Sequence, residues 1–350
     1  MKRILKFSLV LLVICFVLIA GGKKEKGAEE KVVGKGVIYY MAPLLWDEFQ
    51  TGSKLMIEKF AKELGYEIKS LNAADSAINQ IAQMDDIIPL KPAAIILNSV
   101  DSSTIVGSVE KAKAEGIPVL VYDRFITETE IDFHSVVGTI KMGEIGADEC
   151  AKFLKNKYGK EKGVVLEIMG DTGDMYTILI DQGFRDRIGK KYPNIETIVK
   201  DTPMWDPTVA ARVADDQLTA RKNIDIIFLH SDARATAIVP VLESHRYKKG
   251  DIILIGTDGS PTSLDTIRNG WMQETIAVPM VQQAWGLYEF LDEILAGKQI
   301  KTGKYDIKGV QAELINEKWG PTLYLPGEIL TKDNIENPDL WGNLKVEVEQ

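Results

Sequence analysis

An aspartate and an arginine, Asp123 and Arg124, follow directly on an apolar run, Val119 to Tyr122. The run has the length and the β-branched content of a strand buried on both faces, so the two charged side chains should lie at its carboxyl end. In open α/β sheets that edge borders the crevice where ligands bind. A carboxylate accepts hydrogen bonds and a guanidinium donates them, so the pair suits an uncharged ligand with many hydroxyls. A strand-end ion pair without a ligand would leave the same pattern.

Polar and aromatic residues recur at the ends of other predicted strands. In the first half of the chain they are Trp46, Asp47 and Phe49, then Asn98 and Asp101. In the second half they are Gly170 to Asp174, Trp205-Asp206, Ser231-Asp232 and Thr257-Asp258-Gly259. Helix capping accounts for some of these six endings, but together with Asp123-Arg124 they make seven in register, which favours a shared ligand site.

The elements that must position these residues alternate between strand and helix along the chain. Strand-like apolar runs and amphipathic segments succeed one another from Gly36 to Tyr122, and the same order begins again at Met142 and runs to Val278. Such alternation requires a parallel sheet with right-handed crossovers. We therefore expect an α/β protein with two doubly wound parallel-sheet lobes whose strand ends face a common cleft.

The remaining segments connect or follow these units. Phe133 to Gly138 is expected to be a short extended crossing, and Met280 to Leu295 a single apolar helix. Short strands are expected at Tyr305 to Ile307 and Leu323 to Leu325.

Charge and composition point to a globular, exported protein. The 350 residues are 45% hydrophobic and carry a formal charge of −9. The first 30 residues hold six Lys or Arg and three Glu, so the rest carries −12, which disfavours nucleic acid as a partner. A basic start, an apolar run from Phe7 and small residues up to Gly22 have the layout of a secretory signal. We expect a periplasmic or extracytoplasmic location.

The sequence offers little for catalysis, metal binding or disulfides. Cys15 lies in the predicted signal, so Cys150 is alone and is expected to be a buried apolar residue. The three histidines, His134, His230 and His245, belong to no nucleophile or zinc motif, and no phosphate-binding loop occurs. We expect no enzyme activity, no metal and no cofactor. A buried His with satisfied hydrogen bonds is the preferred interpretation of His230.

Several phrases resemble the periplasmic monosaccharide-binding proteins of ABC importers, the type I class for ribose, xylose and galactose, and xylose-binding proteins most closely. The phrases are Val119 to Arg124 followed by Ile131-Asp132-Phe133, Lys62 to Gly65, Ser231-Asp232-Ala233, and Ile329 to Ile335. Ile19 to Gly22 resembles a lipoprotein box, but Gly22 stands where the lipid-carrying Cys should be, which leaves a membrane tether open.

The resemblance implies a two-lobed sugar receptor and a set of binding residues. Carried over position by position, the ligand-binding residues are Asp47, Phe49, Asp123, Arg124, Trp205, Ser231 and Asp258. Each has a structural alternative: a helix cap for Asp47, a turn for Asp258, core packing for Phe49 and Trp205. Asn98 and Asp101 are interpreted as turn and cap residues.

Three positions depart from that pattern. An Arg expected after Gly170 lies where this chain has Met175 to Ile180, an Asn is replaced by Ser231, and a Gln or Lys is replaced by Val278. A pocket without those donors would suit a ligand less hydroxylated than the family's usual sugars.

The resemblance also implies the domain order and the partners. We expect a hinge with three crossings, near Val137-Gly138, Val278-Pro279 and Lys308-Gly309. The expected parts are a signal peptide (1–22), a disordered spacer (23–35), a first lobe (36–138 plus 279–308), a second lobe (139–278 plus 309–336) and a surface tail (337–350). The expected partners are a small-molecule sugar and the permease subunits of an ABC importer, with the protein itself a monomer.

The leading interpretation is capture of a monosaccharide, with a pentose such as xylose favoured, and its delivery to the importer. Alternatives are the same role for a polyol, an inositol or a furanosyl signalling molecule, a secreted hydrolase, and a sugar-responsive regulator. The regulator is disfavoured because this chain begins with a signal and not with a helix-turn-helix.

Overall fold

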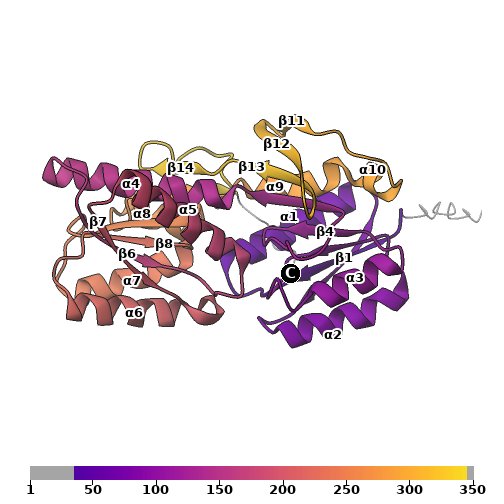
Figure 1. Ribbon diagram of the computed structural model, residues 1–350, viewed down its shortest axis with the longest axis horizontal. Helices are drawn as coiled ribbons and strands as arrows, with labels where there is room; N and C mark the ends of the chain where they lie inside the picture. The colour runs from indigo at the N-terminus through magenta and orange to yellow at the C-terminus, as the bar shows by residue number, and fades with distance from the viewer. Residues whose placement is uncertain (1–34, 345–350) are drawn as a thin grey trace, which may run out of the picture. The chain divides into compact units, whose positions relative to one another are not determined.

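The chain forms two α/β lobes, each built around one mostly parallel sheet (Figure 1). The structure is a computed structural model that describes residues 35–344. The predicted signal peptide and all of the predicted spacer except Lys35 lie outside this range. The expected architecture, two doubly wound lobes with mostly parallel sheets, is confirmed.

The first lobe holds an eight-stranded sheet in the order β11-β12-β13-β5-β4-β3-β1-β2. From β13 to β2 in that order, each strand is parallel to its neighbour. Strand β12 pairs antiparallel with β13, and β11 pairs antiparallel with β12 at the edge. The strands are β1 (Val37–Ala42), β2 (Glu67–Asn72), β3 (Ala94–Leu97), β4 (Val119–Tyr122), β5 (Phe133–Val137), β11 (Gly303–Ile307), β12 (Val310–Glu317) and β13 (Gly320–Leu325). The helices are α1 (Glu48–Glu63), α2 (Ala77–Ile87), α3 (Val106–Ala114), α9 (Met280–Glu289) and α10 (Leu291–Leu295).

Strand β4 shows why this lobe has helices on both faces of its sheet. Side chains of a strand alternate between faces. Val119 and Val121 belong to the apolar cluster that α2 and α3 complete, whereas Leu120 and Tyr122 belong to the cluster on the side of α1 and α9. All four residues are fully buried. The central position of β4 therefore presents its carboxyl end, and Asp123-Arg124, at the middle of the sheet edge.

The second lobe holds a six-stranded sheet in the order β14-β10-β9-β8-β6-β7, with only β14 antiparallel. The strands are β6 (Gly163–Ile168), β7 (Ile195–Lys200), β8 (Ile226–Leu229), β9 (Ile253–Asp258), β10 (Glu274–Ala277) and β14 (Glu328–Thr331). The helices are α4 (Thr139–Tyr158), α5 (Met175–Lys191), α6 (Pro207–Ala220), α7 (Asp232–Ser244) and α8 (Pro261–Arg268).

Close packing of two helices fixes α5, whose first residues reach the cleft. A Cβ on Gly143 of α4 would lie 2.0 Å from the carbonyl oxygen of Ile180, and one on Gly183 of α5 would lie 2.0 Å from that of Ile140. Only glycine lets the two backbones approach this closely. The amino end of α5 is thereby held against the sheet edge.

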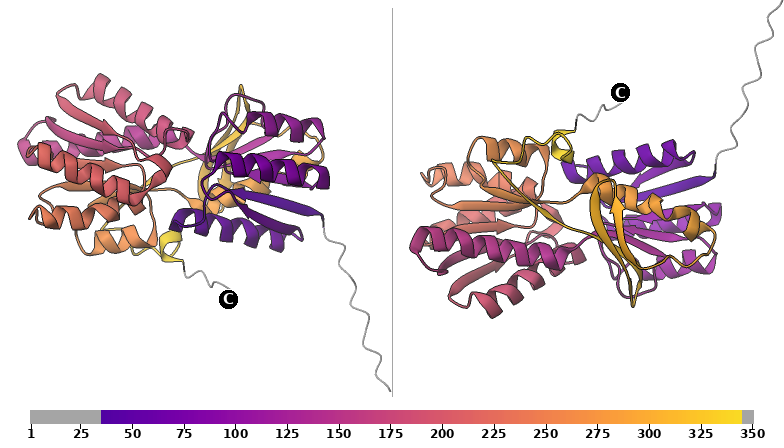
Figure 2. Two further views of the ribbon diagram at one scale, coloured as in Figure 1. Left: turned by 90° about the horizontal axis from the view of Figure 1, so that it is seen from below. Right: turned by 90° about the horizontal axis from the view of Figure 1, so that it is seen from above.

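The late strands differ from the expected domain order. Strands β12 and β13, expected in the second lobe, lie in the first: β13 pairs in parallel with β5, and β12 pairs with β13. Figure 2 shows these orange and yellow strands beside the indigo and purple ones. The third crossing is therefore not at Lys308-Gly309 but at Pro326-Gly327, between β13 and β14. Local sequence pattern could not locate this crossing, because the pairing of β13 with the free edge of β5 determines the lobe to which β13 belongs.

Two further expectations are corrected locally. Phe133 to Val137 is not merely a crossing but strand β5, and the chain leaves the lobe at Gly138, whose N–H donates to the Leu325 carbonyl oxygen at 2.9 Å. The helix expected over Met280 to Leu295 is interrupted at Phe290, which ends α9 and precedes α10.

The segment after β14 is not a surface tail at Trp341. This side chain is buried, and its indole N–H donates to the Asp258 carbonyl oxygen at 2.7 Å. Its ring meets Phe49 of α1 edge-on, with 5.9 Å between centroids. The yellow turn that carries it lies beside α1 in both views of Figure 2. A large aromatic residue buries enough surface to dock an otherwise polar segment.

Candidate functional site

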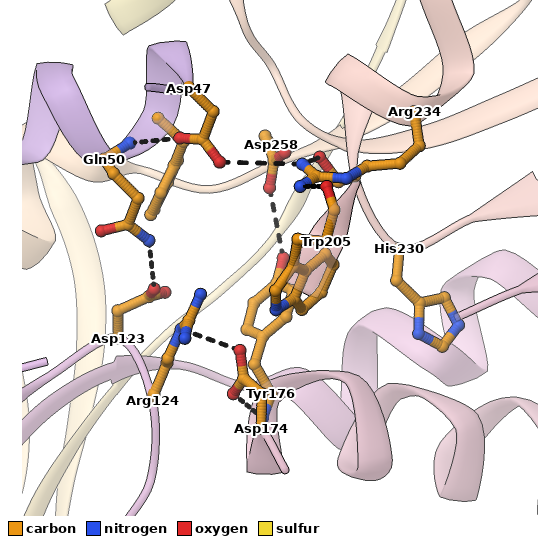
Figure 3. Close-up of a pocket in the computed structure, with 12 residues that line it drawn as sticks. Asp47, Gln50, Asp123, Arg124, Asp174, Tyr176, Trp205, His230, Arg234 and Asp258 are labelled. Atoms are coloured by element: carbon orange, nitrogen blue, oxygen red, sulfur yellow. Dashed lines mark hydrogen bonds and ion pairs between the residues drawn. The ribbon is translucent and has the colours of Figure 1, made fainter. Parts of the chain in front are cut away.

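All seven residues predicted to bind a ligand line one cavity between the lobes (Figure 3). The first lobe contributes four of them, and the second contributes Trp205, Ser231 and Asp258. The full lining is Asp47, Phe49, Gln50, Asp123, Arg124, Asp174, Tyr176, Trp205, His230, Ser231, Arg234 and Asp258. Most of these residues follow the carboxyl ends of β4, β6, β7, β8 and β9, as expected for a ligand crevice in α/β sheets.

Asp123 is held by two amide side chains. Its Oδ2 accepts from Gln50 Nε2 at 3.3 Å and from Asn98 Nδ2 at 3.4 Å, and Asn98 also donates to Gln50 Oε1 at 2.9 Å. Asn98 is therefore more than the turn residue it was interpreted to be. Asp123 Oδ1 has no partner although Asp123 is 4% exposed, and burial raises the pKa of this carboxyl. An acceptor oxygen is thus left for a ligand.

Arg124 reaches from the first lobe to the second. Its Nε lies 2.8 Å from Asp174 Oδ2, and another guanidinium nitrogen donates to the Ser99 carbonyl oxygen at 3.1 Å. Asp174 also caps α5 by accepting from the Tyr176 N–H at 2.8 Å. Burial raises the pKa of Asp174 to about 7. The strand-end ion pair considered for Asp123 and Arg124 is therefore made with Asp174 instead.

Arg234 forms the reciprocal link from the second lobe to the first. It lies in the first turn of α7, 3.6 Å from Asp47 Oδ2, and donates to Ser231 Oγ at 2.9 Å and to the Trp205 carbonyl oxygen. Its guanidinium carbon is 5.1 Å from the ring centres of both Trp46 and Trp205, a double cation–π arrangement. Asp47 also caps α1 by accepting from the Gln50 N–H, so its structural alternative, the helix cap, is present.

Asp258 ends β9 on the opposite wall of the cavity. Its Oδ1 lies 3.4 Å from the Tyr176 hydroxyl, and its Oδ2 accepts from the Asp232 N–H at 3.2 Å. Neighbouring Asp232 is satisfied by the N–H groups of Gly259 and Ser260 and by Thr275 Oγ1. Burial, and then the Asp232 charge, raise the pKa of Asp258 well above its usual range.

Three lining residues have a strained backbone. Asp123, Trp205 and Asp258 have φ values of 67°, 51° and 120°, which residues other than glycine rarely adopt. Each costs on the order of 1–3 kcal/mol and persists where the surrounding structure enforces it, commonly at ligand sites. The strain coincides with the cavity and supports a functional role for these positions.

Three aromatic rings complete the lining. Phe49, Tyr176 and Trp205 are each 5–7% exposed, and the Tyr176 and Trp205 rings are 6.2 Å apart. Phe49 and Trp205 therefore combine core packing with a place in the cavity wall. Flat rings of this kind can stack against the C–H face of a sugar or receive a cation.

Five lining residues were not among the predicted ligand-binding residues: Gln50, Asp174, Tyr176, His230 and Arg234. Spacing gave a signal for some of them. Arg234 lies three residues after Ser231, which places both on one helix face, and Asp174 occupies the residue before a predicted helix. Nothing in the local sequence distinguishes Gln50 or Tyr176 from ordinary helix residues.

His230 lines the cavity yet is a satisfied buried histidine. One ring nitrogen lies 2.6 Å from Thr177 Oγ1 and the other 3.0 Å from Glu167 Oε1. Burial lowers the pKa of His230 to about 3 and raises the pKa of Glu167 well above its usual range. His230 is therefore neutral near pH 7, and it supplies no positive charge to the cavity.

Replacing Glu167 with glutamine should stabilise the protein in alkaline solution. The unfolded carboxyl ionises near pH 4.3, whereas the folded one keeps its proton to higher pH. The stabilisation that comes from the protonated Glu167 carboxyl is therefore fully present below the unfolded pKa, about 4.3. It is lost as the pH rises through the folded pKa. We expect a higher melting temperature for Glu167→Gln at pH 8, a smaller difference at pH 5, and no such trend for the exposed control Glu243→Gln. A melting temperature below the parent at pH 8 would contradict this expectation.

Two absences concern only residues 35–344. No group of three or more His, Cys, Asp or Glu side chains there is arranged to hold a metal ion. No helix in that part of the chain has both the length and the apolar character needed to cross a membrane. Cys150 is buried there, as expected for an apolar packing residue.

Comparisons with known proteins agree with this geometry. A family model described as a periplasmic binding protein domain matches residues 38–299. The ribose import binding protein of Bacillus subtilis is 28% identical over 253 residues, 72% of this chain and 79% of that protein. The D-apiose import binding protein of Paraburkholderia graminis is 29% identical over 258 residues, 73% and 80% of the two chains. A carbohydrate transporter solute-binding protein from Agrobacterium radiobacter, solved with D-arabinose, has the same fold: TM-score 0.76, 18% identity, 88% and 97% coverage.

Proposed function

The chain belongs to the periplasmic binding protein family, and from this premise we propose that it captures a monosaccharide between its lobes and delivers it to an ABC importer. A pentose such as xylose is the favoured ligand. The supporting observation is the cavity itself, because acceptor, donor and aromatic side chains of both lobes surround one small space. The relatives named as ribose and D-apiose import binding proteins support a sugar ligand.

The lining suits capture and not turnover. Carboxylates and guanidinium groups alternate around the cavity, and aromatic rings offer flat apolar faces. Each hydroxyl of a sugar can donate to a carboxylate while it accepts from an arginine. The relatives are named as import binding proteins, which confirms the expectation that this chain is not an enzyme.

Closure of the lobes supplies the mechanism. Three crossings, at Gly138, Val278-Pro279 and Pro326-Gly327, connect the lobes and carry the rotation. In an open form each lobe would present half of the site. A ligand that contacts both halves favours the closed form, because its affinity for that form is greater.

A polyol or inositol is the second candidate, and the arrangement around Ser231 favours it. Ser231 does not stand free in the cavity, since its hydroxyl accepts from Arg234. Val278 is buried at a hinge crossing and does not line the cavity. Arg234 therefore supplies the donor beside Ser231, which sets the pattern of hydroxyls that the site can recognise.

A thermal-shift screen tests the proposal. Purified protein is heated with pentoses, hexoses, inositols and sugar alcohols at millimolar concentration. A ligand present at one hundred times its dissociation constant adds about 2.7 kcal/mol to the free energy of unfolding, so a true ligand raises the melting temperature by several degrees. The exposed variant Asp216→Asn should respond like the parent. If no small polyhydroxy compound shifts the melting temperature, the proposed function is wrong.

Export is part of the proposal. Membership of the family implies an extracytoplasmic location. We infer that residues 1–22 act as the signal peptide and that the mature protein works as a monomer with permease subunits as partners. Residues 1–22 lie outside the described part of the chain.

A further inference from the structure

Two of the four carboxylates that line the cavity form no ion pair within the described part of the chain. Asp47 and Asp174 face Arg234 and Arg124 across the cleft. Among residues 35–344, Asp123 and Asp258 form no ion pair within 4.0 Å with a Lys, Arg or His side chain. With His230 neutral, the lining carries four carboxyl groups against two guanidinium groups, which gives a formal charge of −2 when all four carboxyl groups are ionised.

Both unpaired carboxyl groups are buried. Asp123 is 4% exposed and Asp258 is 7% exposed. A buried charge without a partner is costly, and proteins normally pair it or neutralise it. Asp123 is at least compensated by two amide donors and by its chain neighbour Arg124. Asp258 instead lies against a second buried carboxyl, Asp232, so its ionised form is the less compensated of the two.

Aromatic rings stand next to this excess of negative charge. The Tyr176 hydroxyl is 3.4 Å from Asp258 Oδ1, and the Trp205 ring is its neighbour in the wall. Ring faces combined with carboxylates attract cations, whereas an anion would meet only arginines that already have carboxylate partners.

Resting on the proposed capture of a small polyhydroxy solute, we propose that the ligand carries one protonated amine, as in an amino sugar or aminocyclitol, and that Asp258 holds the ammonium group. An ammonium donates up to three hydrogen bonds and accepts none, which matches acceptor-only carboxylates. The hydroxyls of the same ligand use Asp123, Arg124 and Arg234. Acidic sugars are disfavoured, because both arginines of the cavity already face a carboxylate.

Proton linkage gives this proposal a signature in the wild-type protein. Without ligand, burial favours the protonated form of Asp258, whose titratable and charged neighbours are Asp47, Tyr176, Asp232 and Arg234. An ammonium favours the ionised form and so displaces that proton. Affinity for an amine should therefore rise with pH until the amine itself loses its proton, while affinity for a neutral sugar should not.

Calorimetric titration at pH 6 and pH 7 tests the inference with D-glucosamine, D-galactosamine and D-mannosamine, each beside its neutral parent hexose. We expect at least one amino sugar to bind ten times more tightly than its parent at pH 7, and more tightly at pH 7 than at pH 6. Asp258→Asn keeps an acceptor oxygen but removes the charge, and it should reduce the preference for the amine at least tenfold. The exposed control Asp216→Asn should leave the preference unchanged.

The outcomes separate the two proposals. If the neutral parents bind as tightly as the amino sugars, or if no amino sugar binds, this inference is overturned, while binding of any neutral sugar leaves the proposed function standing. If Asp258→Asn does not fold, the pH dependence of the wild-type protein decides alone: affinity for amines that does not increase from pH 6 to pH 7 overturns the inference.

Discussion

Replacing Arg124 with methionine is expected to weaken ligand binding by two to three orders of magnitude. Arg124 and Asp174 form a buried ion pair between the lobes, with both side chains at most 5% exposed. Removing one partner of such a pair costs about 3–5 kcal/mol, because the other charge stays buried and uncompensated. Every 1.4 kcal/mol corresponds to a factor of ten in affinity. Methionine keeps the apolar bulk of the side chain, so the loss of affinity measures the contribution of the Arg124 charge.

The effect of Arg124→Met should depend on pH. Because the pKa of Asp174 is already about 7, this carboxyl can take up a proton in acid and so reduce the cost of losing its partner. The loss of affinity should therefore be larger at pH 8 than at pH 6. Calorimetric titration with the compound that gives the largest thermal shift measures both values.

A double-mutant cycle tests whether the two residues act as a pair. Asp174→Asn alone should also weaken binding, and the combination with Arg124→Met should cost clearly less than the sum of the single changes. If Arg124→Met binds its ligand as tightly as the parent at pH 8, the ion pair does not contribute to the closed form. Small-angle scattering of the ligand-free protein measures the separation of the lobes independently. Loss of the Arg124–Asp174 pair should shift the molecule toward a more open form.

Replacing Asp123 with alanine should weaken binding at least tenfold. Asp123 Oδ1 is the unpartnered acceptor in the wall of the first lobe, and a hydrogen bond to a charged group contributes about 1.5–3 kcal/mol. The change also leaves the amides of Gln50 and Asn98 without their shared acceptor, which adds to the cost. Titration calorimetry measures the loss.

Two controls accompany Asp123→Ala. Asp216→Ala, on the exposed face of α6, should bind like the parent. Alanine relieves none of the left-handed strain at position 123, whereas Asp123→Gly does, so the glycine variant should be more stable than the alanine variant while binding equally weakly. Binding by Asp123→Ala as tight as the parent's would show that this carboxylate is outside the site.

The two arginines explain how closure and recognition are joined. Each lobe extends one arginine to a carboxylate of the other, Arg124 to Asp174 and Arg234 to Asp47. Because these groups also line the cavity, a ligand that binds there meets residues that already hold the lobes together. The free energy of closure and the free energy of binding are therefore expected to change together when either arginine is altered.

Local pattern was sufficient for the fold class and for the predicted lining residues. Alternating strands and helices imply parallel sheets, and parallel sheets bring strand ends to one edge, so polar residues such as Asp123 and Asp258 could be placed near a common cleft. The family match confirms the resemblance drawn from Val119 to Arg124 and the other phrases. The binding roles of the seven predicted residues remain predictions, although all seven line the cavity.

Contacts between distant segments decided the rest. The sequence by itself determined which residues end the strands, because strand and helix periodicity is a local property. Only the tertiary structure decided that β13 joins the first lobe, that Trp341 docks on Phe49, and that Arg234 pairs with Asp47. Each of these depends on which free edge, apolar surface or opposite charge lies within reach once both lobes have formed, and residues far apart in the chain carry no local signal of that choice.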